Sequence, residues 1–120
     1  MKTKLLFLTV TLFTIVSFSA LGQSNIVTAN IKVYGNCSMC KKRIETALDH
    51  KGIKQAVWNS KTKNLEVIFN SSRISQKEIE KLVAAAGHDT DSIKASDEVY
   101  ATLPFCCLYR DSDGSTQHTK

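Results

Sequence analysis

The sequence lacks the motifs that mark most enzymes. It has no glycine-rich phosphate loop and no Ser-His-Asp arrangement in a recognisable context. Lysine and arginine outnumber aspartate and glutamate by only 16 to 11, and the positive charges are scattered rather than gathered in one run. A nucleic-acid-binding protein would need a stronger and more clustered positive charge. A small binding protein fits this composition better than an enzyme.

The N-terminal segment lacks both a cysteine and the length of a membrane span. Lys2 and Lys4 precede an apolar run over residues 5–16, and small residues follow up to Gly22. This order is typical of a cleaved signal peptide, here residues 1–22. The apolar run is short for a bilayer and has no basic stop-transfer flank, and without a nearby cysteine no lipoprotein acyl chain can be attached. We therefore expect a periplasmic or secreted protein that leaves the cytoplasm as a soluble chain.

The following residues, 25–95, have the pattern of one small α+β domain. Alternating apolar residues predict strands, and helical spacing of apolar residues predicts two helices, the second with a capping box of Ser75 and Glu78 and a closing Gly87. The predicted elements are a strand from residue 26, a helix over 40–52, a hairpin of strands 53–59 and 64–70, a helix over 74–88 and a short strand over 89–95. This β-α-β-β-α-β order predicts a ferredoxin-like sandwich, in which two helices cover one face of an antiparallel sheet.

Residues 96–120 form an extension beyond this domain. Ser96 can cap a short helix, which Pro104, the only proline of the chain, brings to an end. Two adjacent cysteines come next, and residues 111–120 have the composition of a disordered tail.

The four cysteines, Cys37, Cys40, Cys106 and Cys107, fall in two close pairs. An even number in an exported chain first suggests disulfides, but bridges that staple a small fold usually join distant segments, and adjacent cysteines rarely bridge each other. Cys37 lies in the loop after the first predicted strand and Cys40 in the first turn of the next helix, where the helix dipole favours the thiolate. Two such thiolates can be a redox pair or can hold one soft ion, namely Cu(I), Zn(II) or Hg(II).

The segment from Ile26 to Ala95 resembles the heavy-metal-associated domain of copper chaperones, copper ATPases and periplasmic mercury-binding proteins. The resemblance is carried by the order of elements, the Cys-x-x-Cys loop, the hairpin GI…AVWNSKTKNLEVIF and the AAAGH turn. It implies that Cys37 and Cys40 bind a soft ion at the surface and pass it on by stepwise thiolate exchange. It implies Cu(I) as cargo, with Hg(II) or Zn(II) as alternatives, and a metal-transporting membrane protein or another metal carrier as partner.

Three residues near the first cysteine pair differ from the usual pattern of that family. Gly35 stands where the family usually has a methionine that packs under the loop. Met39, between the cysteines, is a flexible loop residue in our interpretation, with a weak thioether ligand as the alternative. His88 replaces a Tyr, Phe or Lys of many relatives, and it is either an auxiliary ligand or a surface histidine at a helix C-terminus.

The second cysteine pair lies outside the region of resemblance. If the extension folds back, with Phe105 and Tyr109 pinning it, Cys106 and Cys107 could complete a site of three or four thiolates. Such a site would hold an ion more tightly and suit a store or sensor. The alternative is a separate tail whose cysteines merely oxidise.

Two other interpretations of the cysteines stay open. A thiol–disulfide oxidoreductase also uses Cys-x-x-Cys at a helix N-terminus, but Asn36 before the first cysteine and Pro104 beside the other pair depart from the thioredoxin pattern. A disulfide-stapled interaction module is the other. We favour a non-enzymatic copper chaperone or buffer, monomeric or bridged into a dimer by metal, whose basic residues 41–43 dock an acidic partner or simply solvate the helix.

Overall fold

The computed structural model describes residues 24–112, so the predicted signal peptide lies outside the described residues. In chain order the elements are β1 (Ile26–Lys32), α1 (Ser38–Ala47), β2 (Ile53–Trp58), β3 (Asn64–Asn70), α2 (Gln76–Ala85), α3 (Asp97–Tyr100), the 3-10 turn η1 (Phe105–Cys107) and α4 (Tyr109–Ser112). None of the helices in this part of the chain has the length and apolar character needed to cross a membrane.

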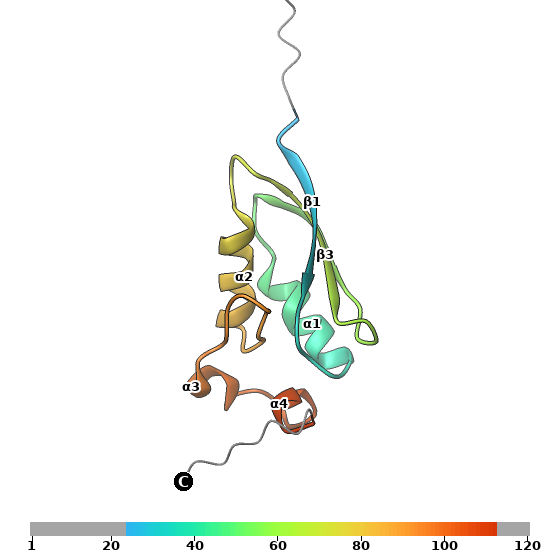
Figure 1. Ribbon diagram of the computed structural model, residues 1–120, viewed down its shortest axis with the longest axis vertical. Helices are drawn as coiled ribbons and strands as arrows, with labels where there is room; N and C mark the ends of the chain where they lie inside the picture. Colours follow the sequence, from blue (N-terminus) through green and yellow to red (C-terminus); the bar gives the residue numbers. More distant parts are fainter. Residues whose placement is uncertain (1–23, 113–120) are drawn as a thin grey trace, which may run out of the picture.

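The sheet has three antiparallel strands in the order β1-β3-β2. Leu65, Val67 and Phe69 alternate along β3 and are buried, because they point toward the core that the helices cover. Figure 1 shows α1 and α2 on the same side of the sheet, and α3 and α4 gathered at the end where β1 leads into α1. The predicted α+β, ferredoxin-like class is confirmed.

The last predicted strand, over residues 89–95, is reduced to a single bridge between Val33 and Thr90. The side chains of this segment explain the difference. The Thr90 hydroxyl accepts hydrogen bonds from the backbone N–H of Ser92 (3.3 Å) and of Ile93 (3.0 Å), which closes a turn. The Asp89 carboxylate accepts from the N–H of Ala95 (2.7 Å). Local bonds therefore take the groups that a longer ladder would have used.

Both main helices are present, with boundaries set by their caps. The α2 capping box is formed as predicted: the Glu78 N–H donates to the Ser75 hydroxyl, and the Ser75 N–H donates to the Glu78 carboxylate. Gly87 follows with φ of +102°, a conformation that other residues rarely adopt. Helix α1 begins at Ser38 and ends at Ala47, earlier at both ends than predicted.

The extension packs onto the sandwich and shares its core. Ser96 caps α3, accepting from the Val99 N–H, and Leu103 and Tyr109 are buried against the domain. Of the segment predicted to be disordered, only the first two residues are described, and they belong to α4. The extension therefore places its two cysteines against the sandwich.

The space under the cysteine loop is filled by Trp58. Its indole is buried and donates to the Val33 carbonyl oxygen at 3.0 Å. A Cβ added at Gly35 would lie 3.1 Å from the Trp58 ring and 3.1 Å from the Cβ of Cys40. The tryptophan thus occupies the place beneath the loop, and a side chain at residue 35 would require Trp58 or Cys40 to shift by a few tenths of an ångström.

Replacing Gly35 with methionine, the residue usual in the resembling family, should destabilise this chain by about 1–3 kcal/mol, because the added side chain overpacks the site. Chemical denaturation measures the loss. In a Trp58→Val background the same substitution should cost markedly less, since the ring is gone. An equal cost in both backgrounds would refute the view that Trp58 sets the size of residue 35.

Candidate metal site

The loop between β1 and α1 brings the first two cysteines together. Cys37 is the N-cap of α1 with extended backbone, and Cys40 lies in the first turn, so their Sγ atoms are 3.5 Å apart. Cys40 is fully buried, and its sulfur accepts the N–H of Asn36 at 3.3 Å. Cys37 is half-buried. The loop therefore presents one accessible sulfur and one sulfur within the core.

The extension adds its two sulfurs to this pair. The turn η1 places Cys106 Sγ 3.1 Å and Cys107 Sγ 3.7 Å from Cys37 Sγ, and the two extension sulfurs are 3.9 Å apart. None of the four cysteines is in a disulfide. The fold-back considered from the sequence is present in the structure, whereas metal binding by these sulfurs stays a prediction.

Three of the sulfurs form a group with the spacing of a metal site. The Sγ atoms of Cys37, Cys40 and Cys107 all lie within 4.8 Å of one another. Metal–sulfur bonds are about 2.3 Å long, so two sulfurs on one ion lie at most about 4.6 Å apart. A small adjustment brings all three onto one ion. The donors are all soft, which favours soft ions over Mg²⁺ or Ca²⁺.

The cysteines differ in how readily they ionise. Partial burial opposes ionisation of Cys37, but hydrogen bonds from the thiols of Cys106, Cys40 and Cys107 and from the Cys40 backbone outweigh it and lower its pKa to about 7. Burial and the neighbouring sulfurs raise the pKa of Cys107, and contact with Cys37 raises that of Cys106. Without metal, Cys37 is therefore about half ionised at neutral pH, while the raised pKa values keep Cys106 and Cys107 as thiols.

His88 lies beside this cluster but outside the three-sulfur group. It is buried, its Nδ1 donates to the Tyr34 carbonyl oxygen at 2.8 Å, and its ring stacks on Tyr109. Burial lowers its pKa, and the charge of Arg43 lowers it further. Its Nε2 has no hydrogen-bond partner among the described residues. The alternative of a surface histidine is wrong, while the auxiliary-ligand role stays a prediction.

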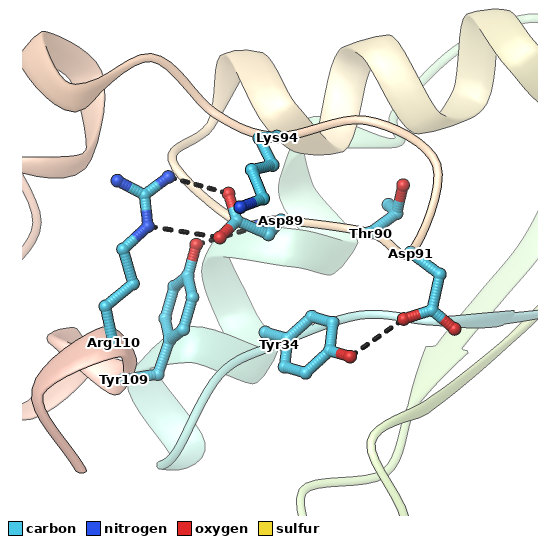
Figure 2. A pocket seen from close by; sticks show the side chains of 7 residues that line it. All are labelled: Tyr34, Asp89, Thr90, Asp91, Lys94, Tyr109 and Arg110. Atoms are coloured by element: carbon cyan, nitrogen blue, oxygen red, sulfur yellow. Dashed lines mark hydrogen bonds and ion pairs between the residues drawn. The ribbon is translucent and has the colours of Figure 1, made fainter. Parts of the chain in front are cut away.

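An ion pair fixes the extension to the domain (Figure 2). Nε and Nη2 of Arg110 donate to the Asp89 carboxylate, at 3.1 and 2.8 Å. Arg110 also donates to the Ala95 carbonyl oxygen. The Tyr109 hydroxyl accepts from the Asp89 N–H and donates to the Gly87 carbonyl oxygen. We call Asp89, Tyr109 and Arg110 the clamp. It holds the chain immediately after Cys107.

The clamp keeps Asp89 charged despite its position. Burial would disfavour the carboxylate, but the hydrogen bonds from Arg110 and from the Ala95 N–H outweigh burial and hold the pKa of Asp89 below its usual value. A bidentate, charge-assisted pair of this kind is among the stronger polar contacts in proteins. Sequence reasoning named Tyr109 as a possible pin but missed Asp89 and Arg110, which no local pattern connects.

The other aromatic expected to pin the extension does not do so. Phe105 is 93% exposed and stands beside Cys106 at the surface. Met39 is also exposed, at 47%, and its Sδ lies 3.9 Å from Cys106 Sγ. The site therefore has an apolar, sulfur-bearing rim.

Two of the three basic residues expected to dock a partner serve the fold. Lys41 pairs with Glu45 and donates to the Trp58 carbonyl oxygen at 3.0 Å. Arg43 donates to the Ala86 carbonyl oxygen, and its Nε is buried. Lys42 is exposed. A basic docking face made of all three side chains is therefore not what the structure presents.

Solved structures with a similar fold include copper proteins. The chain superposes on CopZ metallochaperone with a TM-score of 0.52 and 23% identity, covering 53% of this chain and 98% of that chain. A Bacillus anthracis protein assigned as copper-ion-binding gives a TM-score of 0.54 and 23% identity, over 57% of this chain and 99% of that one. The N-terminal domain of a potential copper-translocating P-type ATPase from Bacillus subtilis, in its Cu(I)-loaded state, gives 0.50 and 25% identity, over 52% and 81%.

The chain has the fold of a heavy-metal-associated domain. The resemblance predicted from the sequence is thereby confirmed. No protein-family model and no curated protein sequence matches the chain. The matched structures cover little more than half of this chain, and they are themselves almost fully covered, so the similarity concerns the sandwich.

The ionisation of Cys37 can be tested directly in the metal-free, reduced protein. Its alkylation rate should rise with pH through a midpoint of about 7, the pKa of Cys37, because the thiolate is the species that reacts. In Cys106→Ala the midpoint should move upward, because a thiol that stabilises the thiolate is lost. Peptide mapping by mass spectrometry gives the rate at Cys37 alone. An unchanged midpoint in the variant would contradict the role assigned to Cys106.

The clamp can be tested through the accessibility of Cys107. Arg110→Met should destabilise the extension by about 3 kcal/mol or less, at the low end for a broken buried pair because Arg110 is partly exposed. Each 1.4 kcal/mol raises the open population about tenfold, so alkylation of the fully buried Cys107 should accelerate by up to roughly a hundredfold. The matched control is Arg73→Met, an exposed arginine in the turn before α2. Equal Cys107 rates in both variants would show that the ion pair does not hold the extension.

Proposed function

We propose that this protein is an exported soft-metal-binding protein that holds Cu(I) and passes it on by thiolate exchange. The observation that carries the proposal is the three-sulfur group of Cys37, Cys40 and Cys107 at one end of a sandwich whose fold is shared with copper proteins. The donor set contains only sulfur, which suits Cu(I). The metal is cargo: it enters and leaves as the protein works.

The number of sulfurs favours Cu(I) or Hg(II) over Zn(II). Structural zinc sites are almost always tetrahedral and take four protein ligands. Here the group has three members, and Cys106 lies outside it. Soft ions that accept fewer thiolates fit the three-sulfur group without a fourth ligand.

The burial of the site favours a buffer or a slow carrier over a fast shuttle. Cys40 and Cys107 are both fully buried, and the clamp holds the segment that covers them. A partner thiolate can approach Cys37, which is half-buried, but it reaches the other two sulfurs only when the extension opens. Exchange then includes a local opening step, which slows release.

The partner in this proposal is a metal-transporting membrane protein or another metal carrier. One similar structure is the N-terminal domain of a potential copper-translocating P-type ATPase. Contact would centre on the rim of exposed Met39 and Phe105 beside the sulfurs, with Lys42 nearby on α1. The signal-peptide pattern of residues 1–22 supports the export in this proposal, with exchange in the periplasm or outside the cell.

The test is an anaerobic Cu(I) titration of the reduced full chain against a competing chelator. The first equivalent should bind tightly, and Cys37→Ser or Cys40→Ser should abolish that binding. Cys107→Ser should weaken it by at least the roughly 10- to 100-fold that the loss of an outer-shell partner costs, since here a thiolate is lost. A Cu(I) affinity of the Cys107→Ser variant equal to that of the wild type would rule out the three-sulfur site.

The same reduced full chain also tests the alternative of a thiol–disulfide exchange protein. A thiol–disulfide exchange protein would show no tight Cu(I) binding and, in its reduced form, would reduce a disulfide substrate at a rate that depends on Cys37, forming a Cys37–Cys40 disulfide as the substrate is reduced to thiols. A copper protein should hold Cu(I) against the chelator and regain four free thiols after reduction, since all four cysteines are free in the structure. Failure to compete for Cu(I) would leave copper carriage without support.

A further inference from the structure

The sulfur atoms at this end of the sandwich lie in two layers. The inner layer, Cys40 and Cys107, is fully buried. The outer layer, Cys106 and Met39, is exposed, and the two sulfurs lie 3.9 Å apart. Cys37, half-buried, stands between them. Exposure thus falls stepwise from the rim to the core.

The outer layer is not needed by an ion held in the inner layer. The inner group is complete without Cys106, since Cys37, Cys40 and Cys107 already lie within 4.8 Å of one another. Cu(I) is commonly satisfied by about two or three sulfur ligands. The chain nevertheless holds Cys106 Sγ only 3.1 Å from Cys37 Sγ and brings the Met39 thioether sulfur to 3.9 Å from Cys106 Sγ. Five sulfurs exceed the requirement of one ion.

We propose that Cys106 and Met39 form a second, outer subsite for a soft ion, with the Cys37 thiolate bridging it to the inner site. This inference rests on the proposed function and deepens it by assigning the protein two ions instead of one. A thiolate has lone pairs enough to bind two soft ions at once, and Cys37 Sγ lies close to both layers, 3.5 Å from Cys40 Sγ and 3.1 Å from Cys106 Sγ. No electron is transferred: Cys106 loses its proton as the ion binds, and Met39 contributes a neutral thioether.

The outer subsite should bind more weakly than the inner one. It is open to water, its thioether carries no charge, and it competes with the inner ion for the charge of Cys37. Weak binding at an exposed position suits an arriving ion, which can then move inward when the inner site is vacant. The exposed Phe105 at the rim gives a donor protein an apolar contact next to this subsite.

The experiment counts ions and reports the thioether separately. The reduced full chain, labelled with ¹³C at methionine methyl groups, receives Cu(I) stepwise under anaerobic conditions, and native mass spectrometry gives the number of ions per monomer. The chain has two methionines, so the Met39→Leu variant identifies the NMR signal of the Met39 methyl group. We expect a tight first equivalent that leaves this signal nearly unmoved. A second, weaker equivalent should shift it.

The variants separate the two layers. Cys106→Ser and Met39→Leu should each weaken the second equivalent roughly tenfold or more and leave the first in place. Phe105→Leu, a neighbour at the rim without sulfur, is the matched control and should retain both equivalents.

Three outcomes overturn the inference while leaving the first equivalent, and so the proposed function, intact. They are a wild type that binds one ion only, a second equivalent of unchanged affinity in the Cys106→Ser/Met39→Leu double variant, and a second ion found only in a dimer. Absence of the first equivalent would instead defeat the proposed function and this inference together.

Discussion

The pair between Arg110 and Asp89 is the contact on which the candidate site depends. Asp89 sits at the start of the turn after α2, and Arg110 follows the extension cysteines, so the pair joins the two ends of the segment that carries them. The guanidinium also binds the Ala95 carbonyl oxygen, which ties both ends to the middle. Because the carboxylate is largely buried, losing either partner would leave the other charge poorly solvated. The fold-back is therefore enforced by electrostatics as well as by apolar contact.

The site combines parts that differ in how firmly they are held. Cys37 and Cys40 belong to a loop that the sandwich supports from below. Trp58 fills the space under Gly35, and the ammonium group of Lys63 reaches the Gly35 carbonyl oxygen at 2.5 Å. Cys106 and Cys107 belong to a short extension. Its burial rests on a few side chains and on the clamp. The two cysteine pairs therefore have separate sources of stability.

The sequence predicted the elements that local rules determine. The capping box of Ser75 and Glu78 and the strand alternation of β3 depend on neighbours a few residues away, and both were confirmed. The prediction of a strand over residues 89–95 was wrong, because the side chains of Asp89 and Thr90 form hydrogen bonds with the local backbone. Strand propensity does not reveal that competition.

The parts of the site that the sequence missed depend on distant partners. Arg110 and Asp89 are 21 residues apart, and no periodicity links them. Gly35 looked like the simple loss of a packing methionine, but Trp58 fills that space from another strand. His88 looked like either a ligand or a surface residue, and only its contacts with Tyr34 and Tyr109 show that it is buried. Motifs predicted which residues could bind metal, whereas the packing around them had to come from the fold.

The difference in support between the two cysteine pairs has a consequence for the direction of exchange under the proposed function. Opening the extension breaks the clamp but leaves the loop, Trp58 and the sheet in place, since no strand is involved. The first sulfurs to leave an ion are then those of the extension, Cys106 and Cys107, and Cys37 and Cys40 keep their spacing. An ion on two sulfurs in a half-buried loop is open to attack by an incoming thiolate. A partner that binds the extension in its open form would therefore favour release, whereas a donor that leaves it closed would favour retention.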